Sequence, residues 1–225
     1  GRLFLRHGIR LTVLHYKNQL AMAGKMPLIF SVVHVQLRAA LLLEFPLQFI
    51  RSHLDYLGAI EFGVARDATS FIASLTELKP FLRALLVADG TVTLLLRAYF
   101  DEDVLVETTG QSDFVLEFAL PHLGLAKGDD AFFRQVKLTG RKTGHTYAQA
   151  SSVLNPAALK PELFAALIKE DVGMGDVLRN SARGSYREIL DVRALDESRM
   201  ARTYTVVLDA NPAILITEIF NTKWF

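Results

Sequence analysis

A carboxylate interrupts an otherwise apolar and β-branched segment close to the end of the sequence. Residues 213–220 read Ala-Ile-Leu-Ile-Thr-Glu-Ile-Phe, the usual pattern of a strand buried on both faces. Strand alternation places Glu218 on one face with Ile216 and Phe220. A carboxylate is costly to bury unless it has a partner or a chemical role, so Glu218 is a candidate general acid or base.

A cation occupies a similar position in residues 130–138. Arg134 shares its face with apolar residues, whereas Gln135 and Lys137 mark the opposite face as the wetter one. Two alternatives stay open. Arg134 and Glu218 form a buried structural ion pair, in which case removing Arg134 severely destabilises the fold. Alternatively they line an apolar pocket, where Arg134 clamps a substrate carboxylate and Glu218 moves a proton or orients a hydroxyl.

The elements that must position these two charges follow from the periodicity of the chain. Helical patterns dominate the first hundred residues, and the helix pair in 68–100 is expected to begin at Thr69 or Ser70 and to divide at Asp89-Gly90. Strand and turn patterns dominate afterwards. The expected later elements are a strand (103–111), a hairpin (130–138 and 145–154), helices (160–169 and 173–181) and a closing hairpin (200–208 and 213–220).

This order of elements predicts an α+β fold, an antiparallel β-sheet flanked by helices. Residues 1–65 are predicted to be a helical, apolar N-terminal extension, and residues 66–225 the α+β domain. The extension has three possible roles: a dimerisation element that forms a homodimer, a lid over the pocket, or the product of a mis-assigned gene start.

Composition excludes several classes of function. The 25 Lys and Arg against 24 Asp and Glu give a net charge of +1, which offers no footprint for nucleic acid. Without cysteine, thiolate catalysis and the common zinc and iron–sulfur sites are excluded, and the scattered histidines predict no metal site. Arg38 and Glu44 interrupt the most apolar stretch, so no membrane span is expected. We expect a cytoplasmic protein that needs no cofactor.

Four blocks, in order, resemble the chorismate pyruvate-lyase family in its divergent branch of actinobacteria, cyanobacteria and plastids. The arginine that binds a carboxylate in that family corresponds to Arg134, and the glutamate of its T-E-x-F signature corresponds to Glu218. Gly173-Met174-Gly175 stands where the family commonly has Pro-Leu-Gly. The blocks are residues 85–111, 132–154, 171–178 and 201–220.

The resemblance implies the chorismate lyase-like fold and a lyase that eliminates pyruvate from chorismate, an acidic small molecule, to give 4-hydroxybenzoate. It implies that Arg134, with the backbone around Val92 and Met174, holds the ring carboxylate, while Glu218 acts at the C4 hydroxyl. It also suggests Arg202 for the enolpyruvyl carboxylate, although the face of Arg202 is ambiguous. The remaining candidate substrate-binding residues are Thr91, Thr93, Gly173 and Gly175, and capping of a helix is an equal explanation for the two threonines.

Two other functions remain as alternatives. The scaffold could serve secondary metabolism by acting on a larger acidic or polyketide-like substrate, because a fold alone does not fix a reaction. It could also be a non-catalytic small-molecule-binding domain, with Arg134 holding an acidic effector. The low basic charge of the N-terminal residues argues against a DNA-reading partner domain.

Overall fold

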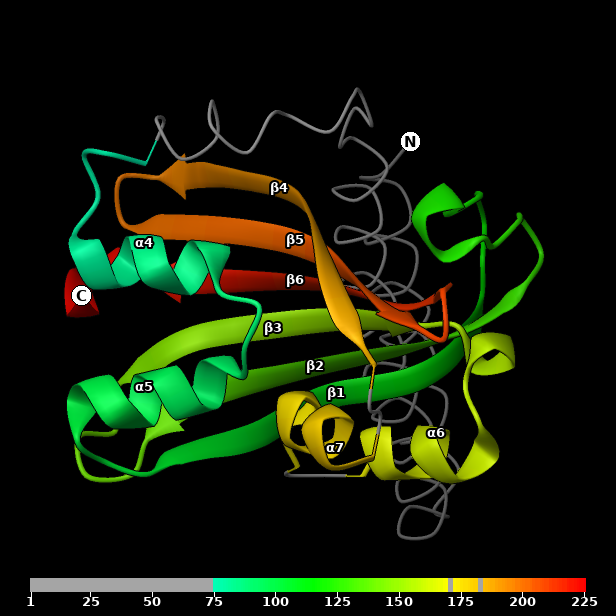
Figure 1. Ribbon diagram of the computed structural model, residues 1–225, viewed down its shortest axis with the longest axis horizontal. Helices are drawn as coiled ribbons and strands as arrows, with labels where there is room; N and C mark the ends of the chain where they lie inside the picture. The colour runs from blue at the N-terminus through cyan, green and yellow to red at the C-terminus, as the bar shows by residue number, and fades with distance from the viewer. Residues whose placement is uncertain (1–74, 170–171, 182–183) are drawn as a thin grey trace, which may run out of the picture. The chain divides into compact units, whose positions relative to one another are not determined.

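A six-stranded antiparallel sheet organises the described part of the chain in the computed structural model (Figure 1). The structure describes residues 75–169, 172–181 and 184–225. Two hairpins, β2–β3 and β5–β6, meet through the pairing of β3 with β6, which gives the order β1-β2-β3-β6-β5-β4. The strands are β1 (Val104–Val115), β2 (Asp130–Gly140), β3 (Thr146–Leu154), β4 (Tyr186–Asp196), β5 (Arg199–Leu208) and β6 (Asn211–Asn221).

Helices accompany the sheet, and Figure 1 shows α4, α5 and α7 in front of it. The α-helices are α4 (Pro80–Val87), α5 (Val92–Phe100), α6 (Pro161–Leu167) and α7 (Met174–Ser181). Short 3₁₀ turns cover Pro121–Leu123, Pro156–Ala158 and Thr222–Trp224. The α+β class predicted from the sequence is therefore confirmed. None of the helices in the described part of the chain is both long and apolar enough to cross a membrane.

The expected start of the first helix of the predicted pair cannot be compared with the structure, which describes only its later part. Thr69 and Ser70 lie outside the described residues, and residues 75–77 form a turn before α4 starts at Pro80. Lys79, with ψ 142°, has the extended backbone that a following proline imposes. Proline then suits the first helical position because its missing N–H has no partner there in any case. The predicted division at residues 65 and 66 and the N-terminal extension also lie outside the described residues.

The strand β4 was missed by the sequence patterns. Its sequence YREILDVRALD mixes charges with apolar residues, and register shifts after Ile189 and Ala194 break the simple alternation that reveals a strand. Charges are common on edge strands because they discourage pairing with other chains. The predicted strand at 103–111 is also longer than expected, since β1 continues to Val115 past an irregularity between Thr108 and Gly110.

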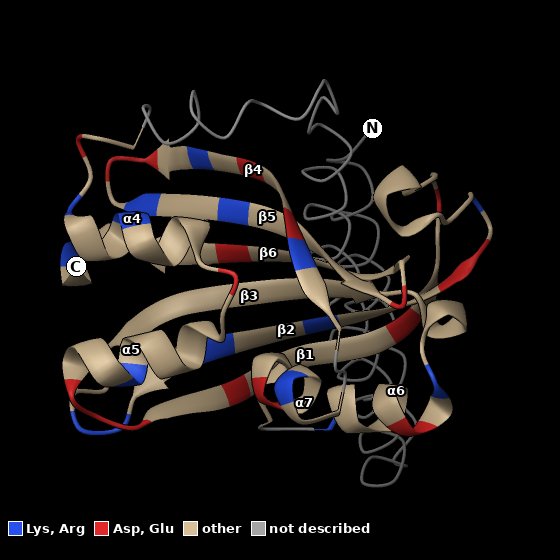
Figure 2. Cartoon of the chain, viewed as in Figure 1, with Lys and Arg blue, Asp and Glu red and all other residues tan. Residues whose placement is uncertain are grey.

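Among the described residues, two apolar clusters pack mainly on the helix-covered face of the sheet, with charges between them. Along β6, Ile216 belongs to one cluster and Phe220 to the other, and Glu218 stands between the two. Along β5, Arg202 stands in the same way between Met200 and Tyr204. Figure 2 shows a red band on β6 and blue bands on β5. The apolar clusters therefore surround a polar centre.

A second buried carboxylate, Glu102, fastens the turn between β2 and β3 to the end of α5. It accepts hydrogen bonds from the backbone amide of Lys142 (2.6 Å), the hydroxyl of Thr143 (2.8 Å) and the hydroxyl of Tyr147. These bonds, the one from Tyr147 foremost, lower the pKa of Glu102 from 4.5 to about 2. The hairpin that carries Arg134 is thus anchored at its turn.

We predict that the Glu102 contacts stabilise the fold fully above pH 4.5 and progressively less as the pH falls toward 2. The sign follows because a carboxylate with a lowered pKa in the folded state must be protonated at the expense of its hydrogen bonds. Urea unfolding of Glu102→Gln between pH 2 and 6 should therefore show a flatter dependence of stability on pH than the wild type. Glu107→Gln, at an exposed site on β1, is the control, and parallel profiles for Glu102→Gln and wild type would refute the prediction.

Candidate functional site

A pocket opens on the helix-covered face of the sheet, and its floor consists of small side chains on β3. The strand register aligns Arg134 with Ser152 and Ile216, and the neighbouring row aligns Ala150 with Glu218. All five residues line the pocket. Because adjacent strands lie about 5 Å apart, β2 and β6 are about 10 Å apart across β3. The small residues of β3 therefore leave a hollow between the row of Arg134 and the row of Glu218.

The N-terminal ends of α5 and α7 both contribute to the wall of this pocket. Thr91, Val92 and Thr93 line it from α5, and Gly173, Met174 and Gly175 line it from α7. The first N–H groups of a helix lack intrahelical partners and carry the positive end of the helix dipole. Two such ends at one pocket favour an anionic ligand.

Gly175 permits the two helix ends to meet. A Cβ atom at this position would lie 2.8 Å from Cγ2 of Thr91, which is closer than real Cβ contacts allow. Thr91 occupies the N-cap position of α5, but its hydroxyl caps none of the described backbone amides of that helix. The sequence explanation of Thr91 as a side-chain cap is therefore wrong, and its side chain instead packs against α7.

Arg134 is buried, with 1% of its surface exposed, and it binds carbonyls at and beyond the end of α6. Its Nη1 donates to the carbonyl of Leu167 at 3.0 Å, and its Nη2 donates to those of Lys169 at 3.1 Å and Val172 at 2.9 Å. Nη2 also lies 3.2 Å from the hydroxyl of Thr108. Arg134 thus lines the pocket and also holds the segment that leads into α7.

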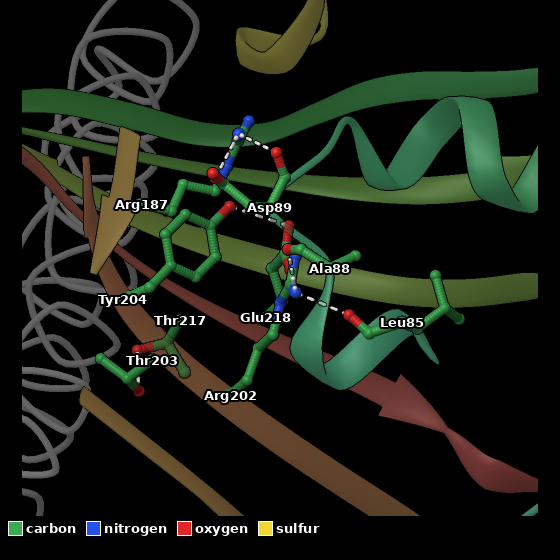
Figure 3. A network of polar contacts seen from close by, with 9 residues as sticks. All are labelled: Leu85, Ala88, Asp89, Arg187, Arg202, Thr203, Tyr204, Thr217 and Glu218. Carbon is green, nitrogen blue, oxygen red and sulfur yellow. Dashed lines mark hydrogen bonds and ion pairs between the residues drawn. The ribbon is translucent and has the colours of Figure 1, made fainter. Parts of the chain in front are cut away.

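Glu218 belongs to a buried polar network that Figure 3 shows at close range. Its Oε2 accepts from Nε of Arg202 at 2.6 Å, and its Oε1 accepts from the hydroxyl of Tyr204 at 3.1 Å. Burial raises the pKa of Tyr204, and the nearby charge of Glu218 raises it further, so Tyr204 remains a protonated donor at neutral pH. The ion-pair partner of Glu218 is therefore Arg202, which lies directly opposite on β5.

The side chain of Arg202 faces the helices, which resolves the ambiguity of the sequence pattern. Its Nη1 donates to the carbonyls of Leu85 (2.6 Å) and Ala88 (2.9 Å) at the end of α4. Its guanidinium also lies 4.9 Å from the ring centre of Tyr204. Arg202 is not part of the pocket lining within the described chain, so it supports Glu218 from behind.

The structure brings together around one pocket every predicted site residue except Arg202. Sequence patterns missed the other lining residues, among them Tyr204 and Arg187. Tyr204 lies two positions after Arg202 on the same strand and therefore shares its face. Assigning Arg202 to the helix-covered face would have placed Tyr204 there as well. Arg187 lies on β4, the strand that the patterns did not reveal. The predicted residues on the pocket wall are Thr91, Val92, Thr93, Arg134, Gly173, Met174, Gly175 and Glu218.

The family model for Rv2949c-like chorismate pyruvate-lyases matches residues 86–225, which include every one of these positions. The chain belongs to this family. Within it, the chorismate pyruvate-lyase of Mycobacterium leprae is 24% identical over 153 residues, covering 62% of this chain and 73% of that protein. The chorismate pyruvate-lyase of Mycobacterium tuberculosis H37Rv is 26% identical over 165 residues, covering 65% and 82%.

Solved structures similar to this family member include PhnF from Mycobacterium smegmatis and its effector domain. Each gives a TM-score of 0.48 at 14% identity and covers 61% of the chain. The similar region spans 66% of PhnF and 91% of the effector domain.

We predict that Gly175→Ala destabilises this family member by about 1–3 kcal/mol, the usual cost of an overpacked contact. The added methyl group would meet Thr91 and push the two helix ends apart. Thermal unfolding should show a lower Tm, and Thr91→Ser in the same chain should recover part of the loss because it removes Cγ2. Gly110→Ala is the matched control, since open space surrounds Gly110. Equal Tm values for the two alanine variants would contradict the prediction.

We also predict that Arg134→Met lowers the free energy of unfolding by about 3 kcal/mol in the absence of ligand. The reason is that three carbonyls lose a charged donor, and each buried unsatisfied group costs about 1–3 kcal/mol. Urea unfolding measures the change. Arg141→Met, which removes an exposed arginine near Asp103, should cost less than about 1 kcal/mol. Equal stabilities for the two variants would argue against the anchoring role of Arg134.

Proposed function

We propose that this protein is a lyase that eliminates pyruvate from chorismate and releases 4-hydroxybenzoate. The observation that carries the proposal is the composition of one pocket. It combines a region suited to a carboxylate with a glutamate whose position is fixed by Arg202 and Tyr204. Membership of the chorismate pyruvate-lyase family supports a lyase with this substrate.

The ring carboxylate would bind near Arg134 and the beginnings of α5 and α7. The guanidinium already points at oxygen atoms there, the carbonyls of Leu167, Lys169 and Val172. A ligand carboxylate is a stronger acceptor than a neutral carbonyl, so a bond from the guanidinium to it can offset the loss of one of these carbonyl contacts. The N–H groups of Val92 and Met174 would add donors from the two helix ends.

The elimination needs a proton movement at the C4 side of the ring. The C4–H bond breaks, its electrons complete the aromatic ring, and the C3–O bond to the enolpyruvyl group breaks with its electrons leaving on oxygen. The proton is returned to the methylene carbon of the leaving group, which becomes pyruvate. Glu218 accepts the C4 proton; if it binds the C4 hydroxyl instead, the proton passes within the substrate from C4 to the methylene carbon. The formation of the aromatic ring supplies the driving force, so positioning and one proton carrier suffice.

Two neighbours hold Glu218 for this task. Arg202 binds Oε2 from behind, and Tyr204 donates to Oε1 from a position on the pocket wall. Both contacts fix the rotamer of the carboxylate before a ligand arrives. Such preorganisation reduces the reorganisation that a reaction would otherwise require.

The direct test is incubation of the purified chain with chorismate, with pyruvate and 4-hydroxybenzoate quantified separately. The proposal requires the two products in equal amounts and at equal rates. If pyruvate fails to appear above the rate of spontaneous decay, the proposed lyase activity is wrong.

We predict that Glu218→Gln lowers kcat by about 100-fold or more, the usual contribution of a general acid or base, while the far-UV circular dichroism stays unchanged. The amide keeps the shape of the side chain but cannot accept the proton. Tyr204→Phe should give a smaller loss, because it removes only one hydrogen bond to Oε1. Glu188→Gln, at an exposed position on β4, serves as the control. Wild-type kcat in Glu218→Gln would exclude this residue from the chemistry.

A further inference from the structure

We propose that Arg187 is a second anion-binding residue of the pocket and that the site therefore selects ligands with two carboxylates. The inference rests on the proposed function, because it assigns the second carboxylate of the substrate to a residue. It arises from the position of Arg187, from its weak present partner and from the engagement of Arg202 with Glu218 and the end of α4.

Arg187 reaches the pocket from the edge of the sheet. It lies opposite Val206 on β5, and Ile189 lies opposite Tyr204, so both β4 residues face the helices. The side chain of Arg187 is 15% exposed and lines the pocket together with Tyr204 and Glu218. Its guanidinium carbon lies 5.9 Å from the ring centre of Tyr204 (Figure 3).

The present partner of Arg187 is a residue that a ligand could replace at little cost. Nη1 of Arg187 donates to the carbonyl of Asp89 at 3.2 Å and to its carboxylate at 3.3 Å. The Asp89 side chain is 62% exposed, and an ion pair with so exposed a partner contributes at most about 1 kcal/mol. Nε of Arg187 is buried and has no hydrogen-bond partner in the described part of the chain. An arginine with an unused donor beside the pocket is suited to an incoming carboxylate.

Arg202 is less suited to this role than Arg187. Its Nε binds Glu218 and its Nη1 binds two helix carbonyls. Its Nη2 has no hydrogen-bond partner in the described part of the chain, but Arg202 does not line the pocket, so a ligand could reach it only by displacing residues of the buried network. Breaking the buried ion pair with Glu218 would strand a charge in the core. The assignment of the enolpyruvyl carboxylate therefore moves from Arg202 to Arg187.

Two separate cationic positions fit a ligand whose carboxylates are themselves separated. Arg134 stands on β2 and Arg187 on β4, at opposite sides of the central strands. Chorismate carries one carboxylate on its ring and another on the enolpyruvyl group, whereas 4-hydroxybenzoate keeps only the first. A guanidinium at the second carboxylate would favour binding of the substrate over the aromatic product and would hold the leaving group as the C3–O bond breaks.

The test compares two stable aromatic acids by isothermal titration calorimetry. The first is 3-(carboxymethoxy)-4-hydroxybenzoate, a dicarboxylate that cannot undergo the elimination, and the second is 4-hydroxybenzoate. We expect wild type to bind the dicarboxylate at least about tenfold more tightly, in line with one charge-assisted contact. Arg187→Gln should lower the affinity for the dicarboxylate by about tenfold and the affinity for the monocarboxylate by less than about twofold.

Three further variants separate recognition from a structural role. Arg187→Lys, which keeps the charge, should retain part of the preference for the dicarboxylate. Asp89→Asn should tighten dicarboxylate binding, because it removes the negative charge that now competes for Arg187, although the bond to the Asp89 carbonyl remains. Arg193→Gln is the matched control, since Arg193 also lies on β4 and also pairs with an aspartate, Asp191, at 3.2 Å. It should leave both affinities unchanged.

The inference is overturned if Arg187→Gln weakens the binding of both ligands equally or if Asp89→Asn weakens the binding of the dicarboxylate. It is also overturned if the wild type does not bind the dicarboxylate more tightly than the monocarboxylate. Failure of the proposed function is recognised separately in the chorismate assay. An Arg187-dependent preference for the dicarboxylate without pyruvate release would uphold the anion site and reject the lyase. Pyruvate release without a preference for the dicarboxylate would uphold the lyase and reject the anion site.

Discussion

The buried ion pair between Arg202 and Glu218 is the constraint on which the rest of the site depends. A carboxylate at the centre of a sheet would be strongly unfavourable alone, and Arg202 supplies its counter-charge from the opposite position on the next strand. The same guanidinium binds the carbonyls of Leu85 and Ala88 at the end of α4. One arginine thus fixes both the proposed proton carrier and the point from which the chain turns into α5.

The second arginine of the sheet repeats this arrangement on the other helix pair. Arg134 binds carbonyls at and beyond the end of α6, and α7 follows within a few residues. In each pair the end of the first helix is held by a sheet arginine, and the beginning of the second helix lines the pocket. Helix carbonyls attract cations and helix amides attract anions, so this arrangement turns the amide ends toward the pocket. The anion binding proposed for the pocket would follow from how the helices are attached.

The sequence was informative where a single charge broke an apolar alternation. Arg134 and Glu218 could be found in this way, and both hairpins and the fold class followed from the strand and turn patterns. The partner of Glu218 could not be found, because Arg202 lies in a strand buried on both faces, where alternation does not distinguish the faces. The edge strand β4 escaped because its charges and register shifts hide the period of two. Arg187 was missed along with it, and only strand pairing brings it to the pocket.

The polar centre is better explained by function than by stability. Replacing a buried ion pair with apolar residues of similar volume often leaves stability unchanged or raises it. The positions of Arg202 and Glu218 lie between two apolar clusters that could have merged into one continuous core. Small residues on β3 also leave space beside Glu218 that larger side chains would have filled. A chain selected for packing alone has no reason to keep both the charges and the hollow, whereas a site that moves a proton on a ring acid requires both.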